Sequence, residues 1–239
     1  MRLLFLLLVL GPCQFAVAAE SADSVPVDCR QIVVVSTAKW ESTRGSVRRF
    51  ERARGGAPWR QIGPTREALL GEHGLAWGAG LHVARRDAAP RKREGDRRAP
   101  AGLFRLTTAF GFAPASRLGV ARFPYRQISV GMEAVEDPAS RFYNQIVQRG
   151  RVQTPDWKSS ERMSEIPDYE LGVVVEHNPQ NIPGAGSCIF IHQWRGDRTG
   201  TAGCTVLHPP HLLELVRWLD ETKHPILLQL PRSEMPPGF

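Results

Sequence analysis

The sequence lacks long hydrophobic runs, internal repeats and any polar linker long enough to demand two domains. Its one strongly apolar run, Leu3–Leu10, is too short to cross a bilayer, and no later segment is longer and equally apolar. These absences argue against a protein with membrane-spanning helices and against a repeat array. The rest of the chain, roughly 220 residues, can bury a sizeable core as one domain or two.

The beginning of the chain has the pattern of a secretory signal peptide. A short basic start precedes the apolar run, and small residues then offer cleavage after Ala18 or Ala19. A lipoprotein signal is disfavoured, because Cys13 follows Pro12 where a lipid-attachment site prefers Gly, Ala or Ser. We therefore expect residues 1–19 to be removed and the mature protein to be soluble and exported, to the periplasm or cell envelope.

Cysteine is scarce, with four residues in the whole sequence. Removal of the leader leaves Cys29, Cys188 and Cys204, and an odd number cannot be fully paired within one chain. Two interpretations stay open: Cys188 is a buried, inert thiol, or it forms a disulfide with Cys29. In both, Cys204 remains the thiol that lies in a turn of small residues.

Positive charge exceeds negative charge, with a net charge of +7. Much of the excess lies in the stretch Arg85–Arg98, which in a cytosolic protein would suggest nucleic-acid binding. The expected export argues against a nucleic-acid partner. Two interpretations remain, a solvated loop of mixed charge or attraction to a polyanionic envelope polymer or to substrate carboxylates.

The hydrophobic pattern predicts a mainly β fold. Short runs rich in β-branched and aliphatic residues predict buried strands, at 31–36, 171–176, 187–192 and 226–230. Residues 46–51 are a predicted hairpin partner of the first strand, and Ile128–Met132 is a further predicted strand. Residues 137–163 are polar and are expected to cover the sheet as loops and short helical turns.

One helix is predicted after Pro209-Pro210, since leucines and a valine recur there at helical spacing. Many short strands with a single packing helix favour a predominantly β fold over an alternating β/α sheet.

The most informative segment contains His192 and Cys204. A thiol becomes a nucleophile when a base removes its proton. The apolar run before His192 predicts that the imidazole lies at the end of a buried strand. Thr201, Ala202 and Gly203 then lead to Cys204 and leave room for a substrate carbonyl. The pattern favours nucleophilic thiol catalysis.

A metal site is the rival interpretation of the same segment. His192, Cys204, His208 and His211 would have to supply the ligands. The spacing of the last three matches no zinc motif, and a proline pair lies between the two final histidines.

With these residues in view, the chain resembles the YkuD-type L,D-transpeptidases, cysteine enzymes that act on peptidoglycan stem peptides. The likeness extends over residues 28–231, which leaves 232–239 as an expected C-terminal tail. It is carried by segments at 92–96, 100–104, 143–144, 157, 160–163, 169, 172–178, 184–192 and 201–204. The last two of these segments, taken together, are the specific part of the pattern.

The resemblance implies a β-sandwich catalytic domain with one packing helix after the nucleophile. It places the general base at His192 and the nucleophile at Cys204. It also implies that the backbone carbonyl of Gln193 holds the imidazole, and that amides around Gly203 and Cys204 stabilise the tetrahedral oxyanion. Weaker candidates for substrate contact are Tyr169, Trp194, Thr201 and Ala202, and His177 is a weak catalytic candidate.

Three departures from the broad family pattern bear on the substrate. Ala202 stands where a His is common two residues before the Cys, and Val206 stands where an Asn or Arg is expected two residues after it. The interval from His192 to Cys204 is also shorter than usual. These departures affect the oxyanion site, the substrate pose and the acyl acceptor more than the attack step.

The implied reaction needs neither a metal nor an organic cofactor. The thiolate attacks the carbonyl before a terminal D-alanine and forms a thioester, and an amine from a second stem then completes an L,D cross-link. Water as the acceptor would give an L,D-carboxypeptidase or another hydrolase. A non-catalytic peptidoglycan-binding envelope protein is the remaining alternative, and the oligomeric state stays open.

Overall fold

The computed structural model describes residues 25–82, 90–194, 196 and 199–239. The expected signal peptide and part of the basic stretch lie outside these residues. The strands are β1 (Gln31–Thr37), β2 (Arg44–Glu51), β3 (Arg60–Leu69), β4 (Leu75–Trp77), β5 (Ala99–Gly111), β6 (Tyr125–Gln127), β7 (Met132–Val135), β8 (Gln145–Gln148), β9 (Ser160–Arg162), β10 (Leu171–Val175), β11 (Phe190–Gln193), β12 (Thr205–Leu207) and β13 (Ile226–Pro231). The α-helices are α1 (Ala115–Leu118) and α2 (Pro209–Trp218).

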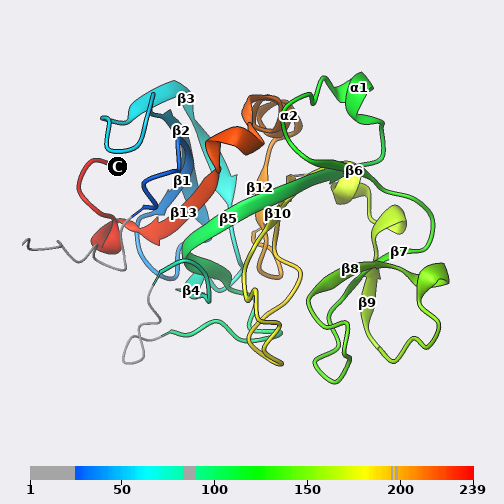
Figure 1. Ribbon diagram of the computed structural model, residues 1–239. Helices are drawn as coiled ribbons and strands as arrows, with labels where there is room; N and C mark the ends of the chain where they lie inside the picture. The colour runs from blue at the N-terminus through cyan, green and yellow to red at the C-terminus, as the bar shows by residue number, and fades with distance from the viewer. Residues whose placement is uncertain (1–24, 83–89, 195, 197–198) are drawn as a thin grey trace, which may run out of the picture.

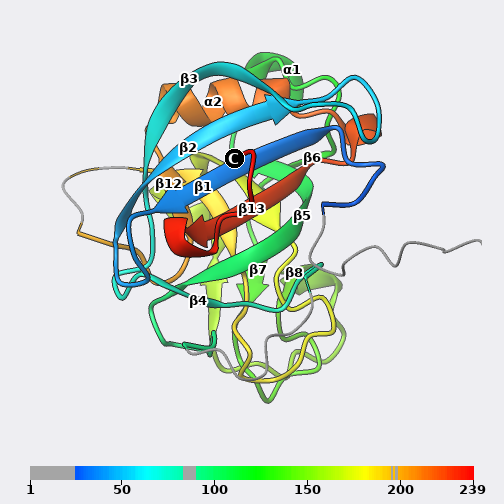
Figure 2. The ribbon, with the colours of Figure 1, turned by 90° about the vertical axis from the view of Figure 1, so that its left-hand side faces the viewer.

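One large sheet dominates the molecule, and this confirms the predicted mainly β class. Its strand order is β10-β11-β12-β3-β2-β1-β13-β5-β4, with β6 beside β5. Because β5 also pairs with β10, the sheet closes on itself. Figure 2 shows β2, β1, β13 and β5 running side by side across one side of the molecule.

The centre of the sheet is formed by the most apolar strands of the sequence. β1 is buried along its whole length and pairs in parallel with β13, with Val34 opposite Leu228. β2 pairs with β1 from the other side in antiparallel register, as the predicted hairpin requires. β-branched residues suit such a position, because their side chains pack well on a pleated surface.

Helix α2 begins where the sequence predicts it. Pro209 and Pro210 occupy its first turn, where the missing amide hydrogen costs nothing. Leu212, Leu215 and Val216 are at most 2% exposed and belong to the main hydrophobic core. The helix lies near β10 and β11, and its buried side chains share one core cluster with Val173, Val175 and Ile191 of those strands.

A second, three-stranded sheet stands apart from the first (Figure 1) and corrects the expectation for residues 137–163. β8 and β9 lie in this segment and pair antiparallel with the two edges of β7. Both are short, neither alternates apolar with polar residues, and neither contains a fully buried side chain. The predicted strand Ile128–Met132 is also wrong in its extent, since the strand begins at Met132.

The expected tail folds back onto the body of the molecule. Phe239 packs edge-on against Phe50, with ring centroids 5.4 Å apart, and its ring also lies 5.8 Å from that of Trp59. Burial of these aromatic surfaces holds the C-terminal residues against the large sheet.

Candidate active site

The pairing of β11 with β12 brings His192 and Cys204 to the same face of the sheet. The two strands are parallel, with Ile191 opposite Thr205 and His192 opposite Val206. Cys204 directly precedes β12 and therefore lies beside Phe190. Since side chains alternate between faces, Cys204 and His192 share one face, about 8 Å apart between Cα atoms by strand geometry.

The imidazole of His192 is buried and held in one orientation. Its Nδ1 lies 3.1 Å from the carbonyl oxygen of Gln193. A carbonyl oxygen only accepts, so Nδ1 carries the hydrogen and Nε2 carries the lone pair of a base. The ring of Tyr169 packs edge-on against the imidazole at 5.2 Å between centroids. The contact with Gln193 is the one that the family resemblance implies.

The thiol of Cys204 is held between two backbone groups, one at the start of β11 and one in the loop that leads into it. The amide of Phe190 donates to Sγ at 3.3 Å, and Sγ donates to the carbonyl of Cys188 at 3.8 Å. Desolvation and the negative charge of Glu161 raise the pKa of the Cys204 thiol to about 12, although the Phe190 amide opposes this. The resting sulfur is therefore protonated and needs a base.

The turn before the thiol is fixed by Thr201. Its hydroxyl donates to the Cys204 carbonyl at 2.6 Å and accepts from the Gly203 amide at 3.2 Å. Gly203 has φ +150, and a side chain there would lie 3.1 Å from the carbonyl oxygen of Arg98. Glycine is required at this position for both reasons. Ala202 is exposed at the tip of the turn.

Trp194 packs beside this face of the sheet. Its ring stacks on His208 at 4.5 Å, and the guanidinium of Arg44 lies 5.2 Å from it. Its other neighbours are the buried side chains of Leu69 and Val206. The structure thus gives Trp194 a packing role next to His192.

Three segments that are distant in sequence meet near Cys204, and nothing in their spacing along the chain indicates this meeting point. Glu94 accepts hydrogen bonds from the hydroxyls of Tyr143 and Ser187, the latter at 2.8 Å. The Tyr143 hydroxyl in turn accepts from the amide of Gly186 at 3.1 Å. The network fixes the loop that leads into β11.

Asn144 completes this network from a left-handed backbone conformation, with φ +62. Its side-chain oxygen accepts from the amide of Cys188 at 2.8 Å, and its amide group donates to the carbonyls of His177 and Asn178. Cys188, which also has a positive φ, is thereby positioned with its carbonyl toward the Cys204 thiol. The segment 143–144 contributed to the resemblance, but its spacing gave no sign of this role.

Negative charge gathers near the thiol. The hydroxyl of Tyr169 donates to the carboxylate of Glu161, which is partly buried. Burial, together with the charges of Glu161 and Glu94, raises the pKa of Glu136 to about 7. These carboxyl groups disfavour a thiolate at Cys204 and favour a cationic group nearby.

His177 is a structural residue in this arrangement. Its Nε2 donates to the carbonyl of Ala185 at 2.9 Å, and its Nδ1 accepts from the amide of Ala79 at 3.3 Å. Burial lowers its pKa to about 4. A neutral ring with both nitrogens engaged ties two loops together.

Each cysteine in the described part of the chain is free. The thiol of Cys29 donates to the carbonyl of Gln31, and that of Cys188 donates to the carbonyl of Val135, so no disulfide joins them. Burial raises the pKa of Cys29 to about 12 and also raises the pKa of Cys188 well above its ordinary value. Within the described residues, no three His, Cys, Asp or Glu side chains are grouped to hold a metal ion.

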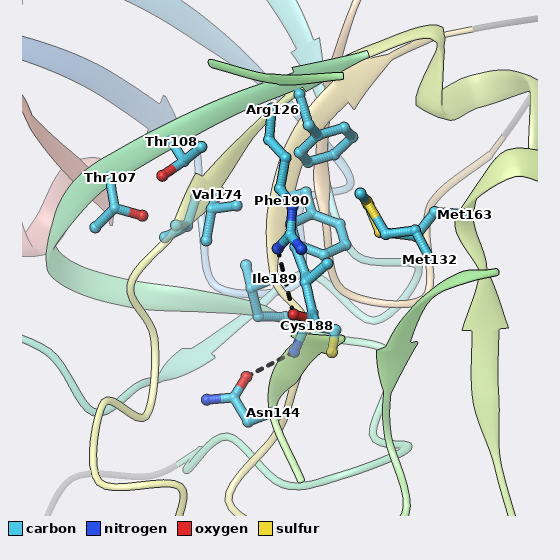
Figure 3. Close-up of a pocket in the computed structure, with 13 residues that line it drawn as sticks. Thr107, Thr108, Arg126, Met132, Asn144, Met163, Val174, Cys188, Ile189 and Phe190 are labelled. Atoms are coloured by element: carbon cyan, nitrogen blue, oxygen red, sulfur yellow. Dashed lines mark hydrogen bonds between the residues drawn. The ribbon is translucent and has the colours of Figure 1, made fainter. Parts of the chain in front are cut away.

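A cavity of about 270 Å³ adjoins the site (Figure 3). Its lining includes Cys188 and Phe190, the two residues whose backbone groups contact the Cys204 sulfur. Met132, Met163 and Arg126 form other parts of its wall. The cavity thus reaches the immediate neighbours of the thiol, on the side of the small sheet.

A model of the L,D-transpeptidase catalytic domain family, YkuD, matches residues 66–227, and the chain belongs to this family. The matched region contains His192, Cys204 and the loops that surround them. No curated protein and no solved structure matches the chain. Across the described residues, no helix has the length and apolar character needed to traverse a membrane.

Proposed function

We propose that the protein is an exported cysteine acyltransferase that acts on peptidoglycan stem peptides through a thioester at Cys204. It would form L,D cross-links or exchange the terminal D-amino acid. The observation that carries this proposal is the shared sheet face of His192 and Cys204, with the imidazole held by the Gln193 carbonyl. Membership of the family supports the substrate class.

In the proposed first step, Nε2 of His192 takes the proton from Cys204 Sγ as the sulfur attacks the carbonyl carbon before the terminal D-alanine. The C–N bond breaks, and the leaving amine receives the proton from the imidazolium. In the second step an amine of another stem attacks the thioester and releases the thiol, and the proton returns to sulfur. Water in place of the amine gives a shortened stem.

The high pKa of the resting thiol fits a proton transfer that accompanies attack. A stable thiolate would lie among Glu161 and Glu136, whose charges oppose it. A tetrahedral oxyanion also needs donors. The amide of Gly203 is bonded to Thr201 in the resting structure, so we propose the Cys204 amide as the first donor.

The proposed location outside the cytoplasmic membrane follows from the leader-like residues 1–19 and from the substrate, which lies there. The structure is consistent with a free thiol in such a compartment, because each of the three described cysteines is free.

The test combines purified muropeptides with two matched variants. Cys204→Ala should abolish both thioester formation and D-alanine release, whereas Cys188→Ala should retain them. Chromatography with mass detection distinguishes dimeric products, which indicate a transpeptidase, from shortened monomers, which indicate a hydrolase. A carbapenem should add its mass at Cys204 in the wild type.

Acylation at Cys29 or Cys188 would contradict the assignment of the nucleophile. Binding to sacculi without acylation or D-alanine release would instead support a non-catalytic wall-binding protein.

A further inference from the structure

One lysine of the basic stretch is buried, although one interpretation of that stretch is a solvated loop of mixed charge. The side chain of Lys92 is 4% exposed, and its ammonium donates to Asp96 at 2.6 Å and to the carbonyl of Arg93 at 2.8 Å. A buried ammonium is costly unless it is paired, so its position is specific.

The carboxylate that pairs with Lys92 is itself fixed. Asp96 accepts from the amide of Arg98 at 2.9 Å through one oxygen and from the amide of Arg93 at 2.7 Å through the other. Neither partner can rotate away without breaking several hydrogen bonds. The loop therefore presents Lys92 in a single geometry.

The ammonium group lies under the turn that carries the nucleophile. Its nitrogen is 3.7 Å from the position that a Cβ would take at Gly203, the residue before Cys204. The aliphatic part of the side chain lies against Gly186, at 3.1 Å from the equivalent position there. Lys92 thus fills the space beside two glycines, one in each of the loops that bracket the thiol.

The other charged groups around Cys204 are mainly acidic. Glu161 on β9 and Glu136 after β7 raise the pKa of the thiol, and Lys92 lowers it. Other titratable groups of the described residues in this region are His192 on β11, Tyr169 before β10, Cys188, Glu94, Asp96 and Arg126. A fixed cation in poorly solvated surroundings is well suited to offset the carboxylates.

We propose that Lys92 is a positioning residue for the acyl transfer, whose fixed ammonium stabilises negative charge developing at Cys204 and in the adjoining oxyanion. The role in catalysis rests on the proposed function. The effect on the thiol does not, because it can be measured without any peptidoglycan substrate.

The test measures the rate at which iodoacetamide alkylates Cys204 at fixed pH, with peptide mass spectrometry to resolve the site. Well below the pKa, this rate follows the thiolate fraction, so one unit of pKa changes it tenfold. Removing Lys92 alone leaves an unbalanced carboxylate, whereas removing Asp96 alone leaves an unbalanced ammonium.

We therefore expect Asp96→Asn to react fastest and Lys92→Met to react slowest. The wild type should be second, and the double variant that carries both substitutions should be third. Lys92→Met should be about tenfold slower than the wild type. Lys92→Arg should stay near the wild-type rate. Lys39→Met, at an exposed lysine after β1, is the matched control and should not change it.

A purely structural role would not give this order. If Asp96→Asn slows alkylation as Lys92→Met does, or if the double variant equals Lys92→Met, the proposal is wrong. If Lys92→Met fails to fold by circular dichroism, the comparison of Asp96→Asn with the double variant still decides the question. An ordered series with no activity on muropeptides would overturn the proposed function and leave this inference standing.

Discussion

The half of the molecule around β1, β13 and α2 and the half around Cys204 are held together by different means. In the first, buried aliphatic side chains pack between a sheet and a helix. In the second, hydroxyl, amide and carboxyl groups from distant segments bond to one another and to loop backbone. Apolar burial is non-directional and therefore tolerates small changes of geometry. In a buried polar network, by contrast, every polar group needs a hydrogen-bond partner.

Backbone conformation shows the same contrast. Six described residues other than glycine have a positive φ: Arg97, Asn144, Asn178, Asn181, Cys188 and His224. All except His224 lie in the loops that converge near the thiol. Such conformations persist where surrounding contacts enforce them. The half around Cys204 therefore contains strained backbone conformations that position its polar groups. Substitutions in the two halves should have different consequences.

The largest effect on stability is expected in the apolar half. Leu212→Ala removes a fully buried side chain from α2 and should lower the free energy of unfolding by about 2–5 kcal/mol, because it leaves a cavity. Urea unfolding measures this change. Leu213→Ala, a half-buried neighbour on the same helix, is the control and should cost distinctly less.

The alkylation rate of Cys204 should be the same in folded Leu212→Ala as in the wild type. A changed rate would show that the two halves are coupled and would remove the contrast between them.

A pH-dependent effect is expected in the site half. The pKa of His177 is about 4 in the folded protein and about 6.5 when the ring is unconstrained. Between pH 4 and pH 6.5 the unfolded chain binds more protons at this residue than the folded chain does. The contribution of His177 to the free energy of unfolding is therefore fully present above pH 6.5 and decreases as the pH drops toward 4. The loss amounts to roughly 3 kcal/mol.

His177→Gln can keep both hydrogen bonds without titrating, and its unfolding free energy should fall less between pH 6.5 and 4 than that of the wild type. The raised pKa of Glu136 acts in the opposite sense in both proteins, so the difference between them isolates His177. His73→Gln, at an exposed histidine, is the control. Parallel pH profiles for wild type and His177→Gln would contradict the prediction.

The smallest effect on stability is expected at Asn144. Asn144→Ala leaves the Cys188 amide and two loop carbonyls without this partner, which should cost about 1–3 kcal/mol. Asn144→Gly loses the same bonds but accepts the positive φ, so it should be the milder change.

Both Asn144 variants should alter the alkylation rate of Cys204, because the Cys188 carbonyl contacts its sulfur. An unchanged rate would mean that this network serves stability alone.

Patterns within single segments predicted much of the fold. The β-branched run at 31–36 and the leucine spacing after Pro209 are local signals, and the structure has β1 and α2 there. Residues 137–163 gave no such signal, because β8 and β9 are short, polar and stabilised by pairing with β7.

The candidate site follows the same division. His192 and Cys204 lie in one stretch of sequence, so a motif sufficed to single them out. Lys92 lies beside Gly203, and Glu94 and Asn144 hold the loop that contains Cys188, only because three loops distant in sequence meet there. Nothing in their local sequence distinguishes a buried lysine or a network carboxylate from its solvated neighbours in the same charged run.

The parallel pairing of β1 with β13 has a consequence for how the chain acquires its structure. The first described strand of the large sheet is flanked by the last one, β13, so this ladder cannot form until nearly all residues are available. Contacts of such sequence separation slow folding, because a long loop must close first. Because the large sheet stays incomplete until then, a chain still being synthesised can more easily pass unfolded through a translocation pore, as the proposed export requires.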